Sequence, residues 1–390
     1  MRASKPGPLV VIACGGTGGH LFPGLAVGGE ILARGGRVLL LVSQKEVDQR
    51  ASEGAAGFEI VALPAIGLTR SGWRAFARGF YQSWGVCRKL FGERKPAAVL
   101  AMGGFTSAPP ILAGWLAGTK TFLHEANTLP GRANRWLARF SGRSFVYFSE
   151  TAGRLKSREV EVSGMPVRTE FQRVEPGPAR MVLGLRPGNP VLLAMGGSQG
   201  ASRINELVCK ALPVLRTRCP DLQYIHLTGM KDIDSVAAVY NQAGAKAVVR
   251  PFLTEMELAL GAATLAVSRS GASSLAEFAA MGIPAILIPY PAAADDHQYF
   301  NALSFAESGA AMMFEQRFAT PSFLAERIIS LLADGPGLSL MREKMAARHL
   351  PEAAPMIAER ILSAISPEVF SGEPSPVRAE KSFPLRPGAA

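Results

Sequence analysis

The segment VVIACGGTGGHLFPG, residues 10–24, is the feature of this chain that most narrows its possible folds. An apolar run of strand length ends in four glycines, one threonine and one histidine, and a helix-like stretch follows. Glycines after a parallel strand let the backbone turn tightly and approach a ligand, and the next helix presents unpaired N–H groups to an anion. The spacing matches neither G-x-G-x-x-G nor a Walker P-loop, so tight packing of strand against helix is the alternative explanation.

Two further junctions of this kind, VLAMGGFTS (99–107) and LLAMGGSQG (192–200), indicate the domain plan. Apolar runs alternate with helical patterns, and the runs are continuous, as in parallel strands covered on both faces. We therefore expect an α/β protein with two Rossmann-like domains, residues 1–165 and 166–350, which suits a length of 390 residues. The Pro-, Ser- and charge-rich segment 366–390 is expected to be disordered. The expected strands are Leu9–Cys14, Val38–Val42, Ala98–Met102, Thr121–His124, Ser144–Phe148, Val191–Met195, Gln223–Leu227, Ala247–Val249, Leu265–Val267 and Ala285–Ile288.

The histidine of the first junction is a candidate general base. His20 follows a predicted strand, and open α/β sheets bind ligands at the carboxyl ends of their strands. Histidine titrates near neutral pH, which suits it to proton transfer. A helix-capping or structural histidine is the alternative.

A second polar cluster, SRSGASSLAE (268–277), stands at the end of the apolar run ATLAV. It places a carboxylate, Glu277, in the first turns of a predicted helix, where it can accept both hydroxyls of a ribose. The alternative is a favourable negative charge near a helix N-terminus. Downstream, DDHQYFNA (295–302) again follows a predicted strand, AILIPY.

Seven motifs, in this order and spacing, resemble the MurG family of bacterial undecaprenyl-pyrophosphoryl-MurNAc-pentapeptide N-acetylglucosaminyltransferases. They are GGTGGH…PGLAVG, GGFTSAPP, HEAN, GMPVR, GGSQGA, SRSGASSLAE and DDHQYFNA. The resemblance runs from about residue 9 to residue 360 and implies the GT-B fold, in which two Rossmann-like domains face a cleft. It further implies a donor site in the C-terminal domain and a helix within 351–365 that returns to the N-terminal domain.

The chain departs from the family pattern at three positions. Ala126 stands where the family has Gln in HEQN, Met165 where it has Asn in GNPVR, and Phe105 where it has Tyr. Asn127 and Arg168 match. The departures bear on contacts with the acceptor, and the reaction class implied by the resemblance is unaffected.

The resemblance implies an inverting transfer of GlcNAc from UDP-GlcNAc to the C4 hydroxyl of MurNAc on lipid I, which makes lipid II for peptidoglycan. His20 is the candidate base, and Arg168 with the backbone of Ser198 would stabilise the departing diphosphate. No cofactor is implied, and no DxD pair stands in a loop suited to a metal ion, so we expect none. The other implied substrate-binding residues are Thr17, Gly18, Gly19 and Asn127 in the N-terminal domain, and Leu253 (uracil), Ala272, Ser273, Ser274, Leu275, Ala276, Glu277 (ribose and phosphates) and Gln298 (sugar).

Composition bounds the alternatives. The net charge of +11 points to an anionic partner, but no RNP, KH or zinc motif supports nucleic acid. Four cysteines without a CxxC pair are typical of reduced thiols in the cytosol. Two other functions remain open: another GT-B enzyme acting on UDP-sugars, such as a glycolipid glycosyltransferase or a UDP-GlcNAc 2-epimerase, or a non-catalytic nucleotide-binding protein.

The segment RSGWRAFARGFYQSWGVCRKLFG (70–92) contains no acidic residue and predicts a membrane contact. Its apolar residues recur at spacings of three and four, the pattern of one helical stripe, with basic residues around them. Such a helix suits the interface of an anionic bilayer. The resemblance, through its lipid-linked acceptor, implies that this bilayer is the inner membrane and that the contact is with its cytoplasmic face. The alternative is that the stripe packs into the N-terminal domain. The stripe consists of Trp73, Phe76, Phe80, Trp84, Cys87 and Phe91, and the basic residues are Arg70, Arg74, Arg78, Arg88 and Lys89.

Overall fold

The computed structural model describes residues 6–15, 18–44, 57–65, 72–171, 174–197 and 200–365. The chain divides into two units, one formed by residues 1–168 together with 351–390 and the other by residues 169–350. The sequence placed the first boundary after residue 165. The segment 366–390, for which we predicted disorder, lies outside the described residues.

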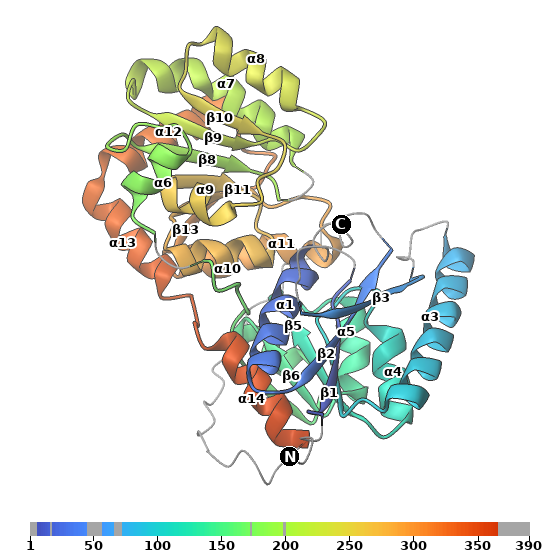
Figure 1. Cartoon of the computed structure of the whole chain (residues 1–390). Coiled ribbons are helices and arrows are strands. Elements are labelled where there is room, and N and C mark those ends of the chain that lie inside the picture. Colours follow the sequence, from blue (N-terminus) through green and yellow to red (C-terminus); the bar gives the residue numbers. More distant parts are fainter. Residues whose placement is uncertain are drawn as a thin grey trace. The chain divides into compact units, whose positions relative to one another are not determined.

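A parallel sheet forms the centre of unit 1 (Figure 1). Its described strands follow the order β3-β2-β1-β4-β5-β6-β7, and each neighbouring pair is parallel. The strands are β1 Leu9–Ala13, β2 Arg37–Ser43, β3 Glu59–Leu63, β4 Ala98–Ala101, β5 Lys120–Glu125, β6 Arg143–Val146 and β7 Glu159–Val162. The helices are α1 Gly18–Ala33, α3 Trp73–Arg94, α4 Ala108–Leu116, α5 Arg132–Leu137 and α14 Ala353–Ile365, with short 3₁₀ turns η1 Ala138–Phe140 and η2 Ser149–Arg154. Parallel strands need a crossover of a dozen or more residues, usually a helix, and α1, α3, α4 and α5 lie in four of these connections.

Alternate side chains of β1 build two cores, one on each face of this sheet. Val10 and Ile12 pack with α1 and α14, while Val11 and Ala13 pack with α3, α4 and α5 (Figure 1). Every β1 residue is buried, which explains the continuous apolar run in the sequence. Helix α14 lies against α1 and buries Ile357 and Ile361, so the last described segment completes the core of the first unit.

Unit 2 repeats the plan with a sheet in the order β10-β9-β8-β11-β12-β13, again parallel throughout the described strands. Helices α7, α8 and α12 lie on one face, and α6, α9 and α10 lie on the other (Figure 1). The strands are β8 Val191–Met195, β9 Gln223–Leu227, β10 Ala247–Arg250, β11 Leu265–Ser268, β12 Ala285–Leu287 and β13 Ala311–Met313. The helices are α6 Pro176–Val182, α7 Ser202–Arg218, α8 Ile233–Gln242, α9 Met256–Ala262, α10 Ala272–Met281, α11 His297–Glu307, α12 Pro321–Ala333 and α13 Gly335–Ala346, with a 3₁₀ turn η3 Ala294–Asp296.

Helix α3 is only partly the exposed stripe that the sequence predicted. Cys87 and Phe91, at its C-terminal end, are buried in the core of unit 1. Toward the N-terminal end Trp73 is 63% exposed, and Phe80 and Trp84 stack at 6.4 Å while remaining half-buried. The packing alternative therefore holds for the last turns of the helix, and an aromatic surface remains on the first turns.

Candidate active site

Both sheets have the strand order 3-2-1-4-5-6 of a doubly wound fold over their first six strands. In such sheets ligands bind outside the carboxyl ends of the strands where the winding reverses, here between β1 and β4 and between β8 and β11. The sequence motifs GGTGGH and GGFTS follow β1 and β4, and GGSQG and SRSGASS follow β8 and β11. The fold thus brings the glycine-rich junctions of each unit together at one edge.

His20 lies in the first turn of α1, and its ring rests on the backbone of the second glycine motif. A Cβ atom added to Gly103 would lie 3.1 Å from His20 Nε2, and one added to Gly104 would lie 3.2 Å from His20 Cε1. Both glycines also have positive φ angles, 106° and 78°. Two features therefore require glycine at these positions: the positive φ angles of the turn, and the His20 imidazole, which leaves little room for a side chain. Thr106 joins the two motifs, since its hydroxyl donates to the Gly15 carbonyl at 2.8 Å.

Glu125, at the end of β5, holds the loop that carries Asn127. Its carboxylate is 2% exposed. It accepts hydrogen bonds from the Asn127 N–H (2.9 Å), the Asn127 amide (3.1 Å), the Gly131 N–H (2.9 Å) and the Asn134 amide (2.8 Å). Burial raises the pKa of Glu125, and these four bonds oppose the rise by favouring the charged form. Asn127, a predicted substrate contact, is thereby oriented by a neighbour that the sequence analysis did not select.

His124, which precedes Glu125 in β5, is fully buried and remains neutral. Burial lowers its pKa to about 4, against a smaller opposing effect of its bond to Gly164. Neutral His124 therefore donates from Nε2 to the Gly164 carbonyl at 3.1 Å. Arg168, four residues further on, stacks its guanidinium 4.5 Å from the ring centroid of Phe22, in unit 1. Its position places it with the His20 edge, whereas the sequence assigned it to the C-terminal domain.

In unit 2, helix α10 divides the six predicted ligand residues into two groups. Ser273, Ser274 and Glu277 are partly exposed and share one face of the helix, because they are spaced by three and four residues. Ala272, Leu275 and Ala276 are buried beneath them, so they can meet a ligand only through their backbone.

Gln298, at the start of α11, is held by one bond to its backbone and one to its side-chain amide. Its backbone carbonyl accepts from the Ser270 hydroxyl at 2.7 Å, and its side-chain Oε1 accepts from the Tyr290 N–H at 3.0 Å. Asn301, fully buried, donates to the Ser270 carbonyl at 3.2 Å. Helices α10 and α11 are therefore tied together where the sequence predicted ribose and sugar contacts.

The remaining predicted residues are distributed as follows. Leu253 lies in the loop between β10 and α9. Gly200 has a φ of 72°, and a Cβ atom there would lie 2.2 Å from the Thr228 carbonyl oxygen, so this turn also requires glycine. Gly18 and Gly19 begin α1, whereas Thr17 and Ser198 lie outside the described residues.

Glu125 and Asn134 in unit 1 and Arg269 in unit 2 were not predicted from the sequence. Glu125 belongs to the motif HEAN, so a signal for it was present. Asn134 stands in a helix, and only the folded structure brings it to β5.

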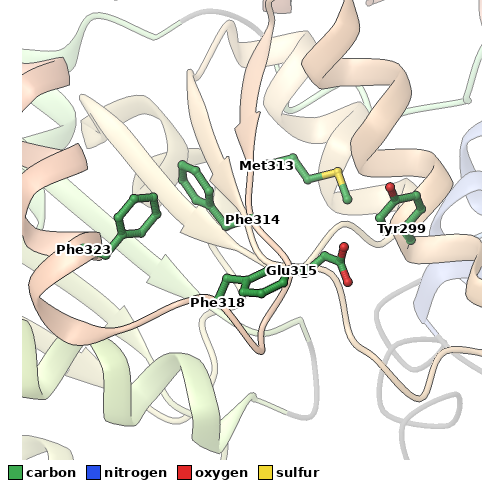
Figure 2. A pocket seen from close by; sticks show the side chains of 6 residues that line it. All are labelled: Tyr299, Met313, Phe314, Glu315, Phe318 and Phe323. Carbon is green, nitrogen blue, oxygen red and sulfur yellow. The ribbon is translucent and has the colours of Figure 1, made fainter.

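A shallow pocket of about 290 Å³ lies beside the unit 2 edge (Figure 2). It is lined by Tyr299 of α11 and by residues in or after β13: Met313, Phe314, Glu315, Phe318 and Phe323. None of these was predicted as a site residue. Within the described ranges, no group of three or more His, Cys, Asp or Glu side chains is arranged to hold a metal ion.

Comparisons with known proteins agree with this geometry. The N-terminal domain of glycosyltransferase family 28 matches residues 10–146, and the C-terminal domain of that family matches residues 191–360. Relatives named UDP-N-acetylglucosamine–N-acetylmuramyl-(pentapeptide) pyrophosphoryl-undecaprenol N-acetylglucosamine transferase occur in Syntrophus aciditrophicus and Desulforudis audaxviator. The first is 36% identical over 91% of this chain and 98% of its own length, and the second is 35% identical over 90% and 97%.

Solved structures show the same fold. The crystal structure of Acinetobacter baumannii MurG has a TM-score of 0.72 and 27% identity, and the match covers 91% of this chain and 99% of that one. A UDP-GlcNAc 2-epimerase from Neisseria meningitidis, bound to UDP-GlcNAc, has a TM-score of 0.67 at 13% identity over 91% and 99% of the two chains, a likeness of fold alone.

The two Rossmann-like units, each with a glycine-rich edge, form the GT-B fold, and the matches to both domains of glycosyltransferase family 28 identify the class as a glycosyltransferase. The chain belongs to the MurG family, the UDP-N-acetylglucosamine–N-acetylmuramyl-(pentapeptide) pyrophosphoryl-undecaprenol N-acetylglucosamine transferases. The fold class and the family inferred from the motifs are confirmed.

Proposed function

We propose that this enzyme transfers GlcNAc from UDP-GlcNAc to the C4 hydroxyl of MurNAc on lipid I, forming lipid II for peptidoglycan. The observation that carries the proposal is the identity to transferases of this name, 36% over 91% of the chain. The motifs that the resemblance assigned to the two substrates lie at the ligand edges of the two sheets, which supports the same activity.

In the proposed reaction His20 accepts the proton of the C4 hydroxyl of MurNAc, and the oxygen of that hydroxyl attacks C1 of GlcNAc. The C1–O bond to UDP breaks, and its electron pair leaves with the diphosphate. A single displacement converts the α-linked donor into a β-linked product, through a transition state like an oxocarbenium ion. The ring of His20, set on the Gly103–Gly104 turn, and Asn127, held by Glu125, form the acceptor side.

Unit 2 binds the donor in this proposal. Glu277 accepts the ribose hydroxyls, Ser273 and Ser274 with the N-terminus of α10 meet the phosphates, and Gln298 contacts the sugar. The backbone of Leu253 meets uracil. Backbone N–H groups near Ser198, at the GGSQG turn, stabilise the charge that develops on the leaving diphosphate, and Arg168 adds to this from unit 1. The proposed reaction involves no metal ion or cofactor.

The enzyme works, we propose, as a peripheral protein on the cytoplasmic face of the inner membrane, with no role for nucleic acid. Among the described residues, no helix has the length and apolar character needed to cross a bilayer. The first turns of α3 offer an alternative means of contact. Trp73 and Tyr81 are 63% and 72% exposed, and Arg74 and Arg78 are exposed in the same turns. Arg88 and Lys89 are exposed in the later turns of the helix. Aromatic and basic side chains together suit an anionic membrane interface.

The experiment that tests the function measures UDP release from UDP-GlcNAc with and without lipid I. A lipid I transferase releases UDP only when lipid I is present, and a chelator leaves the rate unchanged. Conversion of UDP-GlcNAc into its C2 epimer, still linked to UDP and formed without an acceptor, would favour an epimerase. Release of UDP with diacylglycerol would favour a glycolipid glycosyltransferase. Binding of UDP-GlcNAc without turnover under any condition would favour a non-catalytic nucleotide-binding protein.

A further inference from the structure

Arg269 joins three strand ends at the ligand edge of unit 2. It directly follows β11, and its Nη1 donates to the carbonyls of Ile288 (2.9 Å) and Pro289 (3.0 Å), which follow β12. Its Nη2 donates at 2.7 Å to Oε1 of Gln316, in the segment after β13. That segment also carries Glu315 and Phe318 of the pocket in Figure 2.

The guanidinium is buried without an acid beside it. Arg269 is 8% exposed, and in the part of the chain that the structure describes no carboxylate lies within ion-pair distance of it. Burial lowers its pKa to about 10, so it stays charged at neutral pH. Its partners are two backbone carbonyls, one side-chain amide and the ring of Tyr290, whose centroid lies 5.4 Å away. A buried charge is costly, so a side chain kept here must do something that an apolar one cannot.

The segment that Arg269 holds, residues 288–290, has few other hydrogen bonds available to fix its backbone. Pro289 and Pro291 have no N–H, so from residue 289 to residue 291 the backbone has a single donor, the N–H of Tyr290. That N–H is used on Oε1 of Gln298, at 3.0 Å. This bond fixes which end of the amide is the oxygen, so the Nε2 donor lies at the other end, where an oxygen of a ligand can accept from it.

We propose that Arg269 is a positioning residue for the donor sugar. It anchors the segment from Ile288 to Tyr290. The N–H of Tyr290 sets the orientation of the Gln298 amide, and that amide in turn donates to a hydroxyl of GlcNAc. The inference rests on the proposed function, which places Gln298 on the sugar. A lysine would keep the charge but lose the planar fork that reaches three acceptors on two strand ends.

The chain contains a matched control at the opposite end of the same sheet. Arg180 also donates to two backbone carbonyls, Ala262 (2.9 Å) and Pro187 (2.8 Å), and to one side chain, Thr264 Oγ1 (3.0 Å). These acceptors precede β8 and β11, so they lie at the amino ends of the strands, away from the ligand edge. Arg180→Lys therefore removes a comparable set of bonds from the same unit without touching the donor edge.

The test compares Arg269→Lys, Arg180→Lys, Gln298→Ala and the double variant Arg269→Lys/Gln298→Ala. Calorimetry gives the Kd of UDP-GlcNAc and of UDP without an acceptor, thermal unfolding gives Tm, and turnover with lipid I gives kcat/KM. We expect Arg269→Lys to lower kcat/KM for UDP-GlcNAc by roughly 10- to 100-fold, as small displacements of positioning groups do. UDP, which lacks the sugar, should bind nearly as in the parent. The double variant should be no worse than Gln298→Ala alone, since Arg269 acts through Gln298.

Three outcomes would overturn the inference: additive losses in the double variant, equal weakening of UDP and UDP-GlcNAc by Arg269→Lys, or an equal loss of kcat/KM in Arg180→Lys. If Arg269→Lys does not fold, Gln316→Leu replaces it, because it removes one of the three bonds and should show the same pattern to a smaller degree. A parent that does not bind UDP-GlcNAc would contradict the proposed function itself. A parent that binds it and is weakened by Gln298→Ala but not by Arg269→Lys or Gln316→Leu would contradict the inference alone.

Discussion

The ring of His20 lies against two glycines with positive φ, and this setting makes its role testable. If His20 is the base, His20→Ala should lower kcat by roughly 10²- to 10⁴-fold, the usual contribution of general base catalysis. UDP-GlcNAc should bind with the parent's affinity, because the proposed donor contacts lie in unit 2. Steady-state turnover with lipid I and calorimetry with UDP-GlcNAc measure the two quantities. Unchanged turnover would return His20 to a structural role.

Glu277 should behave in the opposite way. A carboxylate that grips two ribose hydroxyls interacts equally with the ground state and the transition state, so its loss affects binding more than chemistry. Glu277→Ala should raise KM for UDP-GlcNAc more than it lowers kcat. Glu277 is partly exposed on α10, so the change should leave the fold intact, which Tm can check. A defect confined to kcat would show that Glu277 does not contact the ribose.

Single residues also show where prediction from sequence ends. The glycines were predictable because a tight turn after a strand favours glycine. His20 was predictable because it follows those glycines directly in the sequence. Arg269 was not, because its function depends on carbonyls at residues 288 and 289 and on an amide at residue 316. The sheet topology brings these partners to Arg269, and the sequence around Arg269 does not predict them.

At the scale of elements, the strands that were not predicted from the sequence share one property. Every expected strand is present, but β3, β7 and β13 were not expected. All three are edge strands of their sheets. An edge strand is covered less completely, so it lacks the continuous apolar run that marks a central parallel strand. The sequence EVEV of β7, which is half-buried or exposed throughout, is an example.

Helix α3 carries the prediction about the membrane. Each basic residue near an anionic surface contributes about 1 kcal/mol, screened by salt. Replacing Arg74, Arg78, Arg88 and Lys89 by Gln should weaken sedimentation with anionic vesicles and lower lipid I turnover. UDP-GlcNAc affinity should not change, because the proposed donor site lies in unit 2. Vesicle binding by the parent should fall as salt is raised.

A control for this prediction must lose the same charge elsewhere. Arg186, Lys210, Lys246 and Arg327 are exposed on unit 2, and replacing them by Gln removes four positive charges as well. We expect that variant to sediment with vesicles like the parent. If the α3 variant also sediments like the parent, α3 is not the membrane contact, and if both variants lose binding equally, net charge rather than α3 is responsible.

At the scale of the whole molecule, two units with the same strand order each contain a fully buried histidine, His124 in unit 1 and His226 in unit 2. His226 is hydrogen-bonded to Tyr240 (3.1 Å) and Asn205 (3.0 Å), beneath the N-terminal half of α7. Burial lowers the pKa of both histidines to about 4. Neither was selected from the sequence as a titrating group, because burial is a property of the assembled core.

These histidines predict how stability depends on pH. Above pH 6.5 they are neutral in both folded and unfolded chains and contribute nothing to the dependence. Below pH 6.5 these histidines bind protons in the unfolded chain but not in the folded one. The free energy of unfolding therefore falls as pH drops toward 4, by up to roughly 3 kcal/mol for each histidine. In unit 1 the raised pKa of Glu125 acts in the opposite direction, because the folded state there binds a proton more readily than the unfolded one. Unit 2 should therefore lose protection first, which hydrogen exchange followed peptide by peptide between pH 7 and 4.5 can measure. His226→Gln removes one titrating group and should reduce the pH dependence of unit 2 alone, leaving the part due to other groups with lowered pKa values, such as His349 and Asp232. A parent whose two units lose protection in parallel, or a variant with the parent's pH dependence, would refute this account of His226.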